Sequence, residues 1–85
     1  RLLIADDHEL AREGVRALLE RTGRVTVVAE VGTAEAAVDA AIALAPDLAL
    51  LDIRFAPGAM DGLEAARRIA TEAPTVRVVL LTLHE

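Results

Sequence analysis

Short apolar runs alternate along this chain with longer segments whose apolar residues recur at helical spacing. The alternation is typical of stacked βαβ units, which build a mostly parallel sheet with helices on its faces. It predicts four strands, at residues 2–5, 25–31, 48–51 and 76–82. In such α/β folds, ligands bind at the carboxyl ends of the strands. Residues that end a strand are therefore the first candidates for function.

Three helices are expected between these strands, at residues 10–20, 34–45 and about 63–73. Thr33 is a plausible N-cap for the second, because its hydroxyl can accept from a free helix N–H. Pro46 and Pro74 should end the second and third helices, since a residue before proline is pushed away from helical geometry.

The first of these helices reads as amphipathic. Its apolar residues lie along one face of the helix, while its charged residues, Arg12 among them, fall mainly on the solvent-facing side. Gly14 lies inside it at a cost on the order of 1 kcal/mol relative to Ala. We expect close packing to explain that glycine. The apolar stripe consists of Ala11, Val15, Leu18 and Leu19.

Length and composition allow one domain, residues 1–85, and exclude several functions. The net charge of -5 disfavours nonspecific binding to nucleic acid or anionic lipid. The chain has no cysteine for disulfide or thiol chemistry. No run approaches the roughly 20 apolar residues that span a bilayer. The expectation is a soluble protein of the cytoplasm, without a membrane partner.

Carboxylates end two of the predicted strands. Asp6 and Asp7 follow the first strand, and Asp52 follows the third. A single Asp at such a place often caps the next helix. Capping explains the set less well, because a charge that ends an apolar run is costly near the interior unless it is compensated. A divalent cation held by carboxylate oxygens, with Mg²⁺ the best fit, removes the difficulty.

The ordered set of motifs resembles the receiver domain of bacterial response regulators, a CheY-like family. The matching residues are Asp6-Asp7, Leu50-Leu51-Asp52, Asp61-Gly62 and Leu81-Thr82. The stretch 3–10, with Arg12-Glu13-Gly14, is similar to the NarL/FixJ subgroup, whose receivers precede a LuxR-type DNA-binding effector. The resemblance implies a flavodoxin-like, doubly wound parallel sheet. It also implies a signalling switch in two-component signal transduction rather than an enzyme.

Carried over by position, the resemblance implies that Asp52 takes a phosphoryl group from a sensor histidine kinase. Asp7, Asp52 and the backbone carbonyl of Arg54 would ligate Mg²⁺, with Asp6 acting mainly through water. Thr82 would be the switch hydroxyl that responds to phosphorylation. His8 is expected only to start the first helix as a solvated neighbour, and Gly62 to serve the turn into the third helix.

The chain departs from the family in two places. Residues 53–62 form a connection about two residues longer than usual. The sequence also stops at Glu85, so the strand order 2-1-3-4 lacks the family's fifth strand, its last two helices and its phosphate-contacting lysine. We expect residues 76–81 to form an open edge, which the rest of the parent protein or a second chain, such as a homodimer partner, would cover. DNA would be bound only through an effector outside these residues.

Two alternatives remain open. A receiver-like interaction module that is never phosphorylated would carry the same fold. A Mg²⁺-dependent aspartyl phosphotransferase of the haloacid dehalogenase type would place a second Asp two residues after its nucleophile. Asp52 is followed by Ile53 and Arg54 instead, which disfavours the second alternative.

Overall fold

The computed structural model describes residues 1–53 and 60–81 of the 85. They form one four-stranded sheet with the strand order β2-β1-β3-β4, and every neighbouring pair of strands is parallel. The predicted α/β class and strand order are confirmed. The elements, in chain order, are β1 (Leu2–Ala5), α1 (Glu9–Glu20), β2 (Val27–Val31), α2 (Ala34–Leu44), β3 (Leu48–Asp52), α3 (Gly62–Glu72) and β4 (Arg77–Leu81).

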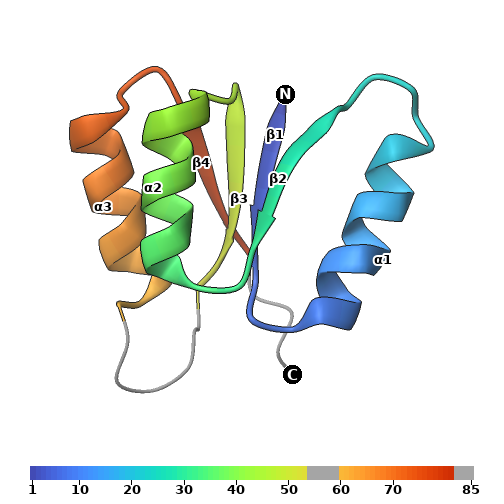
Figure 1. Ribbon diagram of the computed structural model, residues 1–85, viewed down its shortest axis with the longest axis horizontal. Helices are drawn as coiled ribbons and strands as arrows, with labels where there is room; N and C mark the ends of the chain where they lie inside the picture. The colour runs from blue at the N-terminus through green and yellow to red at the C-terminus, as the bar shows by residue number, and fades with distance from the viewer. Residues whose placement is uncertain (54–59, 82–85) are drawn as a thin grey trace.

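The three helices lie on opposite faces of the sheet. Figure 1 shows α2 and α3 side by side on one face and α1 by itself on the other. All four strands run in the same direction, so their carboxyl ends share one edge of the sheet. The turns that lead from β1 into α1 and from β2 into α2 lie at that edge.

The bounds of three strands differ from the prediction, because pairing with a neighbouring strand, rather than composition, decides where a strand begins or ends. β2 begins at Val27 rather than at residue 25, because pairing with the short β1 starts where Leu2 meets Val27. β3 continues one residue further than expected, because Asp52 pairs with Leu81 of β4. β4 begins at Arg77, one residue later than expected.

Helix ends follow local backbone chemistry. Thr33 caps α2 as predicted, and its hydroxyl accepts from the N–H of Ala36 at 3.1 Å. α2 ends one residue before the predicted bound, since Ala45 takes a left-handed conformation with φ 44° ahead of Pro46. α3 begins at Gly62, and the Asp61 carboxylate caps it by accepting from the N–H of Glu64 at 2.8 Å.

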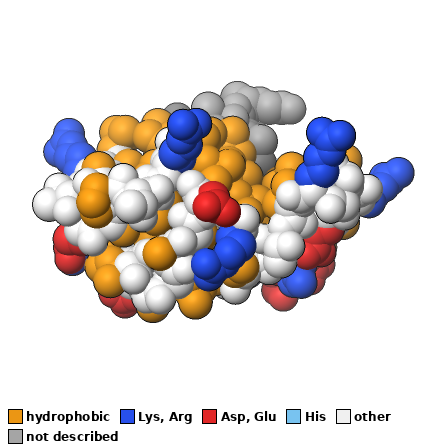
Figure 2. Space-filling model, turned by 90° about the horizontal axis from the view of Figure 1, so that it is seen from above, with side chains coloured by type: hydrophobic (Ala, Val, Ile, Leu, Met, Phe, Trp, Pro, Cys, Tyr) orange, Lys and Arg blue, Asp and Glu red, His pale blue; other side chains and the backbone are white. Residues whose placement is uncertain are grey.

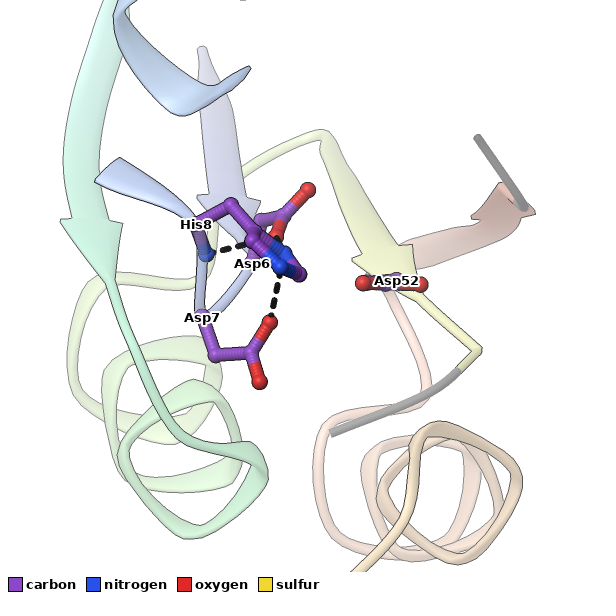
Figure 3. Close-up of side chains that lie close together, drawn as sticks. All are labelled: Asp6, Asp7, His8 and Asp52. Carbon is purple, nitrogen blue, oxygen red and sulfur yellow. Dashed lines mark hydrogen bonds and ion pairs between the residues drawn. The ribbon is translucent and has the colours of Figure 1, made fainter. Parts of the chain in front are cut away.

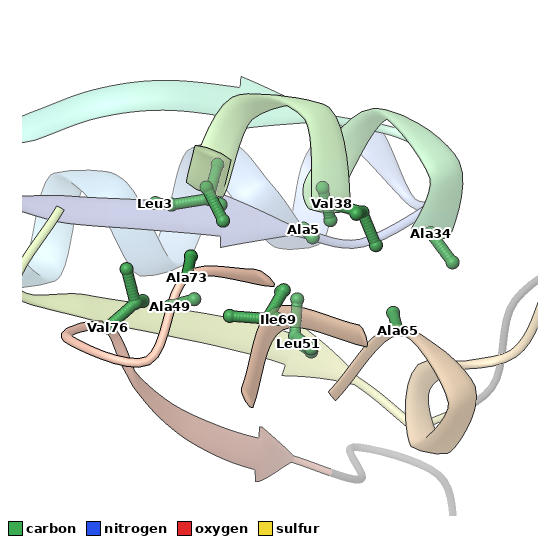
Figure 4. Close-up of a cluster of buried hydrophobic side chains, with 12 residues drawn as sticks. Leu3, Ala5, Ala34, Val38, Ala49, Leu51, Ala65, Ile69, Ala73 and Val76 are labelled. Atoms are coloured by element: carbon green, nitrogen blue, oxygen red, sulfur yellow. The ribbon is translucent and has the colours of Figure 1, made fainter. Parts of the chain in front are cut away.

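The main core lies between the sheet and the α2–α3 pair. Leu3 and Leu51 from the central strands and Ile69 from α3 are fully buried there. Alanines fill much of the remaining space, which lets the two helices approach the sheet closely (Figure 4). The side chains drawn from this core belong to β1, β3, α2, α3 and the segment that leads into β4.

The opposite face is covered less completely. α1 has no buried residue, and Leu10 and Leu18 on it are 84% and 64% exposed. A Cβ added at Gly14 would have nothing within 4 Å, so the expected close packing at this glycine is wrong for the described residues. The charged side of α1 is tied to β2, because Arg16 donates to Glu30 of that strand. Arg16 also donates to Glu20 on its own helix, and the contacts with Glu30 and Glu20 raise the pKa of Arg16.

An apolar groove runs beside α1 near the start of the strands. It is lined by Leu2, Leu19, Val25 and Leu48, with Arg24 and Asp47 at its rim. Figure 2, which views this end of the molecule, shows hydrophobic side chains at the surface among arginines. β4 is the outer strand of the described sheet, as predicted, and Val79 on it is 40% exposed. No helix in residues 1–53 and 60–81 is long and apolar enough to cross a membrane.

Candidate phosphoacceptor and metal site

The register of the sheet brings the predicted carboxylates to one place. Ala5 of β1 pairs with Leu51 of β3, so the residues that follow, Asp6 and Asp52, are level at the carboxyl edge. Both are buried, at 8% and 6% exposure, although each carries a carboxyl group. Figure 3 shows the carboxylate of Asp52 facing the group formed by Asp6, Asp7 and His8.

Backbone hydrogen bonds fix the two strand ends. The N–H of Asp6 donates to the carbonyl of Val31 at 3.1 Å, which ties the end of β1 to β2. The N–H of Ile53 donates to the carbonyl of Leu81 at 3.0 Å, which ties the residue after Asp52 to β4. The carboxylates are therefore held by the sheet itself rather than by a loop.

The turn after β1 is closed by Asp6. Its Oδ1 accepts from the backbone N–H of His8 at 2.8 Å. His8 is the N-cap residue of α1, as predicted, but its side chain makes no capping hydrogen bond. Its ring lies instead against the carboxylates, with Nδ1 2.9 Å from Oδ1 of Asp7 and 3.2 Å from Oδ1 of Asp6. Nothing in the sequence pattern indicates that contact.

Four side chains make up a candidate cation site at this edge. One ligand atom from each of Asp6, Asp7, His8 and Asp52 lies within 4.8 Å of the others. Carboxylate oxygens are the ligands that Mg²⁺ prefers, and like charges so close together repel unless a cation lies between them. The three carboxylates of this set therefore fit the Mg²⁺ ion that the sequence predicted.

Gly62 supports the site by close approach. A Cβ at Gly62 would overlap the backbone carbonyl oxygen of Asp52 and lie 2.9 Å from Cα of Ile53. Its φ is not in the left-handed region, where Gly23 is the one glycine found among the described residues. Gly62 begins α3, where the turn into that helix was predicted, but no left-handed conformation accounts for glycine at this position. Glycine is needed there because α3 begins directly against the end of β3.

Arg12 departs from the predicted solvent-facing position. It is half-buried, and its Nε is buried without a hydrogen-bond partner among the described residues. Arg12 lines a small cavity beneath the strand ends together with Asp6 and Asp52. The amphipathic pattern placed this side chain on the solvent-facing side of the helix. Such a pattern takes no account of how far a long side chain reaches back over the sheet.

Two predicted site residues, Arg54 and Thr82, lie outside the described residues, as does most of the longer connection at residues 53–62. Leu81, which pairs with Asp52, is the last described residue of β4. The metal-ligand role of the Arg54 carbonyl and the switch role of Thr82 remain predictions.

Comparison with known proteins places this geometry in a family. Residues 2–85 match the response regulator receiver domain. The response regulator UvrY of Escherichia coli is 42% identical over 83 residues, which are 98% of this chain and 37% of that protein. The transcriptional regulatory protein NarL of Mycobacterium tuberculosis is 41% identical over 85 residues, all of this chain and 38% of that protein.

Solved structures agree with the sequence relatives. The signal receiver domain of NarL from Mycobacterium tuberculosis superposes with a TM-score of 0.90 at 41% identity, covering 100% of this chain and 67% of that one. RcsB of Salmonella enterica, bound to the promoter rprA with the phosphomimetic BeF₃⁻, gives a TM-score of 0.86 at 26% identity, covering 99% and 69%. The chain thus spans less than two fifths of its curated relatives' length. It belongs to the response regulator receiver domain family, and the relatives it matches are UvrY- and NarL-type regulators.

Proposed function

We propose that residues 1–85 belong to one receiver domain, in which Asp52 accepts a phosphoryl group from a phosphohistidine on a sensor kinase. The observation that carries the proposal is the placement of the 6%-exposed carboxylate of Asp52 at a strand end, level with Asp6, with its ligand atom within 4.8 Å of those of Asp6 and Asp7. A carboxylate buried beside a core of Ala, Val, Leu and Ile, close to two other carboxylates, is costly to maintain. A role as the nucleophile accounts for its placement there.

The transfer needs little covalent help from the protein. A carboxylate oxygen of Asp52 forms a bond to phosphorus while the P–N bond of the phosphohistidine breaks, and the imidazole leaves with the bonding electron pair and takes up a proton. The protein's contribution is to hold that oxygen in place. β3 does so through its pairing with β1 and β4, and Gly62 lets α3 pack against the same backbone.

Asp7 and Asp52 are the proposed direct ligands of Mg²⁺, with the backbone carbonyl of Arg54 as a third and Asp6 acting through water. When bound, the ion neutralises charge on the phosphoryl oxygens and on the carboxylates. Asp7 is suited to a direct role because its side chain is 27% exposed, whereas the side chain of Asp6 is 11% exposed and already accepts from the N–H of His8.

The proposed output is transcriptional. Thr82 would respond to the phosphoryl group as the switch hydroxyl. A DNA-binding effector beyond these residues would convert that response into control of transcription. The protein would act in the cytoplasm. The support is that RcsB, at 26% identity, was solved on a promoter in the presence of a phosphomimetic. The relatives UvrY and NarL are more than twice as long as this chain, which leaves room for such an effector in them.

Intact-mass spectrometry after incubation with a small phosphodonor tests the proposal. The full protein with Mg²⁺ should gain one phosphoryl adduct, which should disappear in Asp52→Asn and when the metal is chelated. Asp39→Asn is the matched control, because Asp39 is an exposed carboxylate on α2, away from the site. It should be phosphorylated like the wild type.

Two other outcomes would replace the proposal. Continuous release of phosphate over many turnovers, lost in Asp52→Asn, would identify a phosphotransferase or phosphatase instead. A protein that is folded and binds Mg²⁺ but never gains an adduct, from either the small donor or a phosphorylated histidine kinase, would be an interaction module with a receiver fold.

A further inference from the structure

His8 has an arrangement that its place in the chain does not require. It occupies the N-cap of α1, where a side chain is expected to bond to the first helical N–H groups, yet it makes no such bond. The ring points instead to the carboxylate cluster, and Figure 3 shows it between Asp6 and Asp7. Its side chain is 63% exposed, so core packing does not hold it in this position.

The spacing of the ring nitrogen from the carboxylates matches that of ligands in one metal shell. Adjacent ligands of an octahedral ion, each about 2.1 Å from the metal, lie about 3.0 Å apart, and opposite ones about 4.2 Å apart. Nδ1 of His8 is 2.9 Å from Oδ1 of Asp7 and 3.2 Å from Oδ1 of Asp6. The whole four-residue set spans at most 4.8 Å. A small closure of the site would place the ligand atoms of Asp7, His8 and Asp52 on one ion, with Asp6 close enough to act through a bound water.

We propose that His8 supplies a nitrogen ligand through Nδ1, so that this site binds divalent transition-metal ions such as Ni²⁺ and Co²⁺ in preference to Mg²⁺. The inference rests on the proposed function, since it concerns the same cation. Imidazole nitrogen suits the later transition metals, whereas Mg²⁺ takes oxygen ligands and keeps its waters. Three carboxylates alone would favour these transition metals less strongly than a set that includes the His8 nitrogen.

The competing explanation is a hydrogen bond, because 2.9 to 3.2 Å is also the distance of an N–H donor from a carboxylate oxygen. In that case the His8 ring occupies the space that a cation would take. Any divalent ion must then displace the ring before it can bind. The two explanations predict opposite effects of removing the ring. Loss of a ligand weakens Ni²⁺ binding selectively, whereas loss of a competitor strengthens the binding of all ions alike.

Isothermal titration calorimetry of Mg²⁺ and Ni²⁺ separates them, with the full protein free of affinity tags and at about pH 8, where an ordinary imidazole is neutral. His8→Asn keeps a good N-cap residue and an oxygen donor but removes the ring nitrogen. We expect it to weaken Ni²⁺ binding about tenfold or more while Mg²⁺ affinity changes less than about twofold. Equal changes for both ions, or tighter binding of both, would overturn the proposal.

A second variant and a second readout keep the result unambiguous. His84→Asn removes the chain's other histidine and should leave the Ni²⁺ preference unchanged; a loss that follows His84 instead would refute the role of His8. In protein labelled with ¹⁵N at histidine, Zn²⁺ should shift the resonance of Nδ1 of His8, and Mg²⁺ should not.

Asp7→Asn should lose the binding of Mg²⁺ and Ni²⁺ together. If Mg²⁺ binding survives Asp7→Asn, the proposed metal site fails, which is a different result from failure of the His8 ligand.

Discussion

Gly62 and Gly14 form a matched pair for testing how α3 positions β3, the strand that ends in Asp52. Each is a glycine within a helix, and each can be changed to alanine. At Gly62 the new Cβ meets three backbone atoms: the carbonyl oxygen of Asp52, Cα of Ile53 at 2.9 Å and the carbonyl carbon of Asp52 at 3.1 Å. At Gly14 it meets nothing within 4 Å.

The expected magnitudes follow from this contrast. Replacing glycine by alanine in an open helical position stabilises a protein by about 0.5 to 1 kcal/mol. Gly14→Ala should show that gain. At Gly62 no side-chain rotation relieves the overlap, because the neighbours are backbone atoms, and overpacking costs about 1 to 3 kcal/mol. The free energy of unfolding of Gly62→Ala should therefore lie about 1 to 3 kcal/mol below that of the wild type, and about 1.5 to 4 kcal/mol below that of Gly14→Ala.

Urea unfolding followed by far-ultraviolet circular dichroism measures the difference, since the chain has no Trp or Tyr for fluorescence. Phosphorylation by a small donor should also be slower in Gly62→Ala, because the strain falls on the backbone of Asp52. If Gly62→Ala is as stable as Gly14→Ala and is phosphorylated at the wild-type rate, then α3 does not constrain β3 as the structure indicates.

Three further results are expected. Thr33→Ala removes the hydroxyl that caps α2 at 3.1 Å and should lower the free energy of unfolding by about 1 kcal/mol in the same urea assay, with Thr33→Ser close to wild type. Ile69→Ala empties a fully buried position and should cost about 2 to 5 kcal/mol, whereas Ile69→Val should cost only about 0.5 to 1.5 kcal/mol. Mg²⁺ at a hundred times its Kd should stabilise the wild type by about 2.7 kcal/mol, seen as a higher Tm, and should give Asp7→Asn no such increase.

The sequence predicted the elements and their order because strands, helices and caps depend on local chemistry. Apolar runs at residues 2–5 and 48–51 became neighbouring strands, and Thr33 capped the helix expected after it. The meeting of Asp6 with Asp52 also followed, since parallel strands that end in Asp bring those residues to one edge. Bounds were wrong by one or two residues, where pairing with a partner strand rather than composition decides the end.

The rest of the site depends on contacts between segments far apart in sequence. Gly62 was assigned to a turn, because nothing local reveals that α3 begins against the carbonyl of Asp52, ten positions earlier. Arg12 was assigned to solvent, although its Nε is buried beside the strand ends. His8 was predicted to be a solvated neighbour of acidic residues, and its side chain is 63% exposed beside Asp6 and Asp7; only the direction of its ring, toward these carboxylates rather than the helix N–H groups, was missed.

The central claim is that the phosphoryl group resides on Asp52. Borohydride reduces an aspartyl phosphate to homoserine, so protein phosphorylated with Mg²⁺ present, then reduced and digested, can be read residue by residue by tandem mass spectrometry. The account predicts homoserine at position 52 and unmodified Asp6 and Asp7 in the same sample. Homoserine at position 6 or 7 with an intact Asp52, in protein that carries one phosphoryl group, would contradict it.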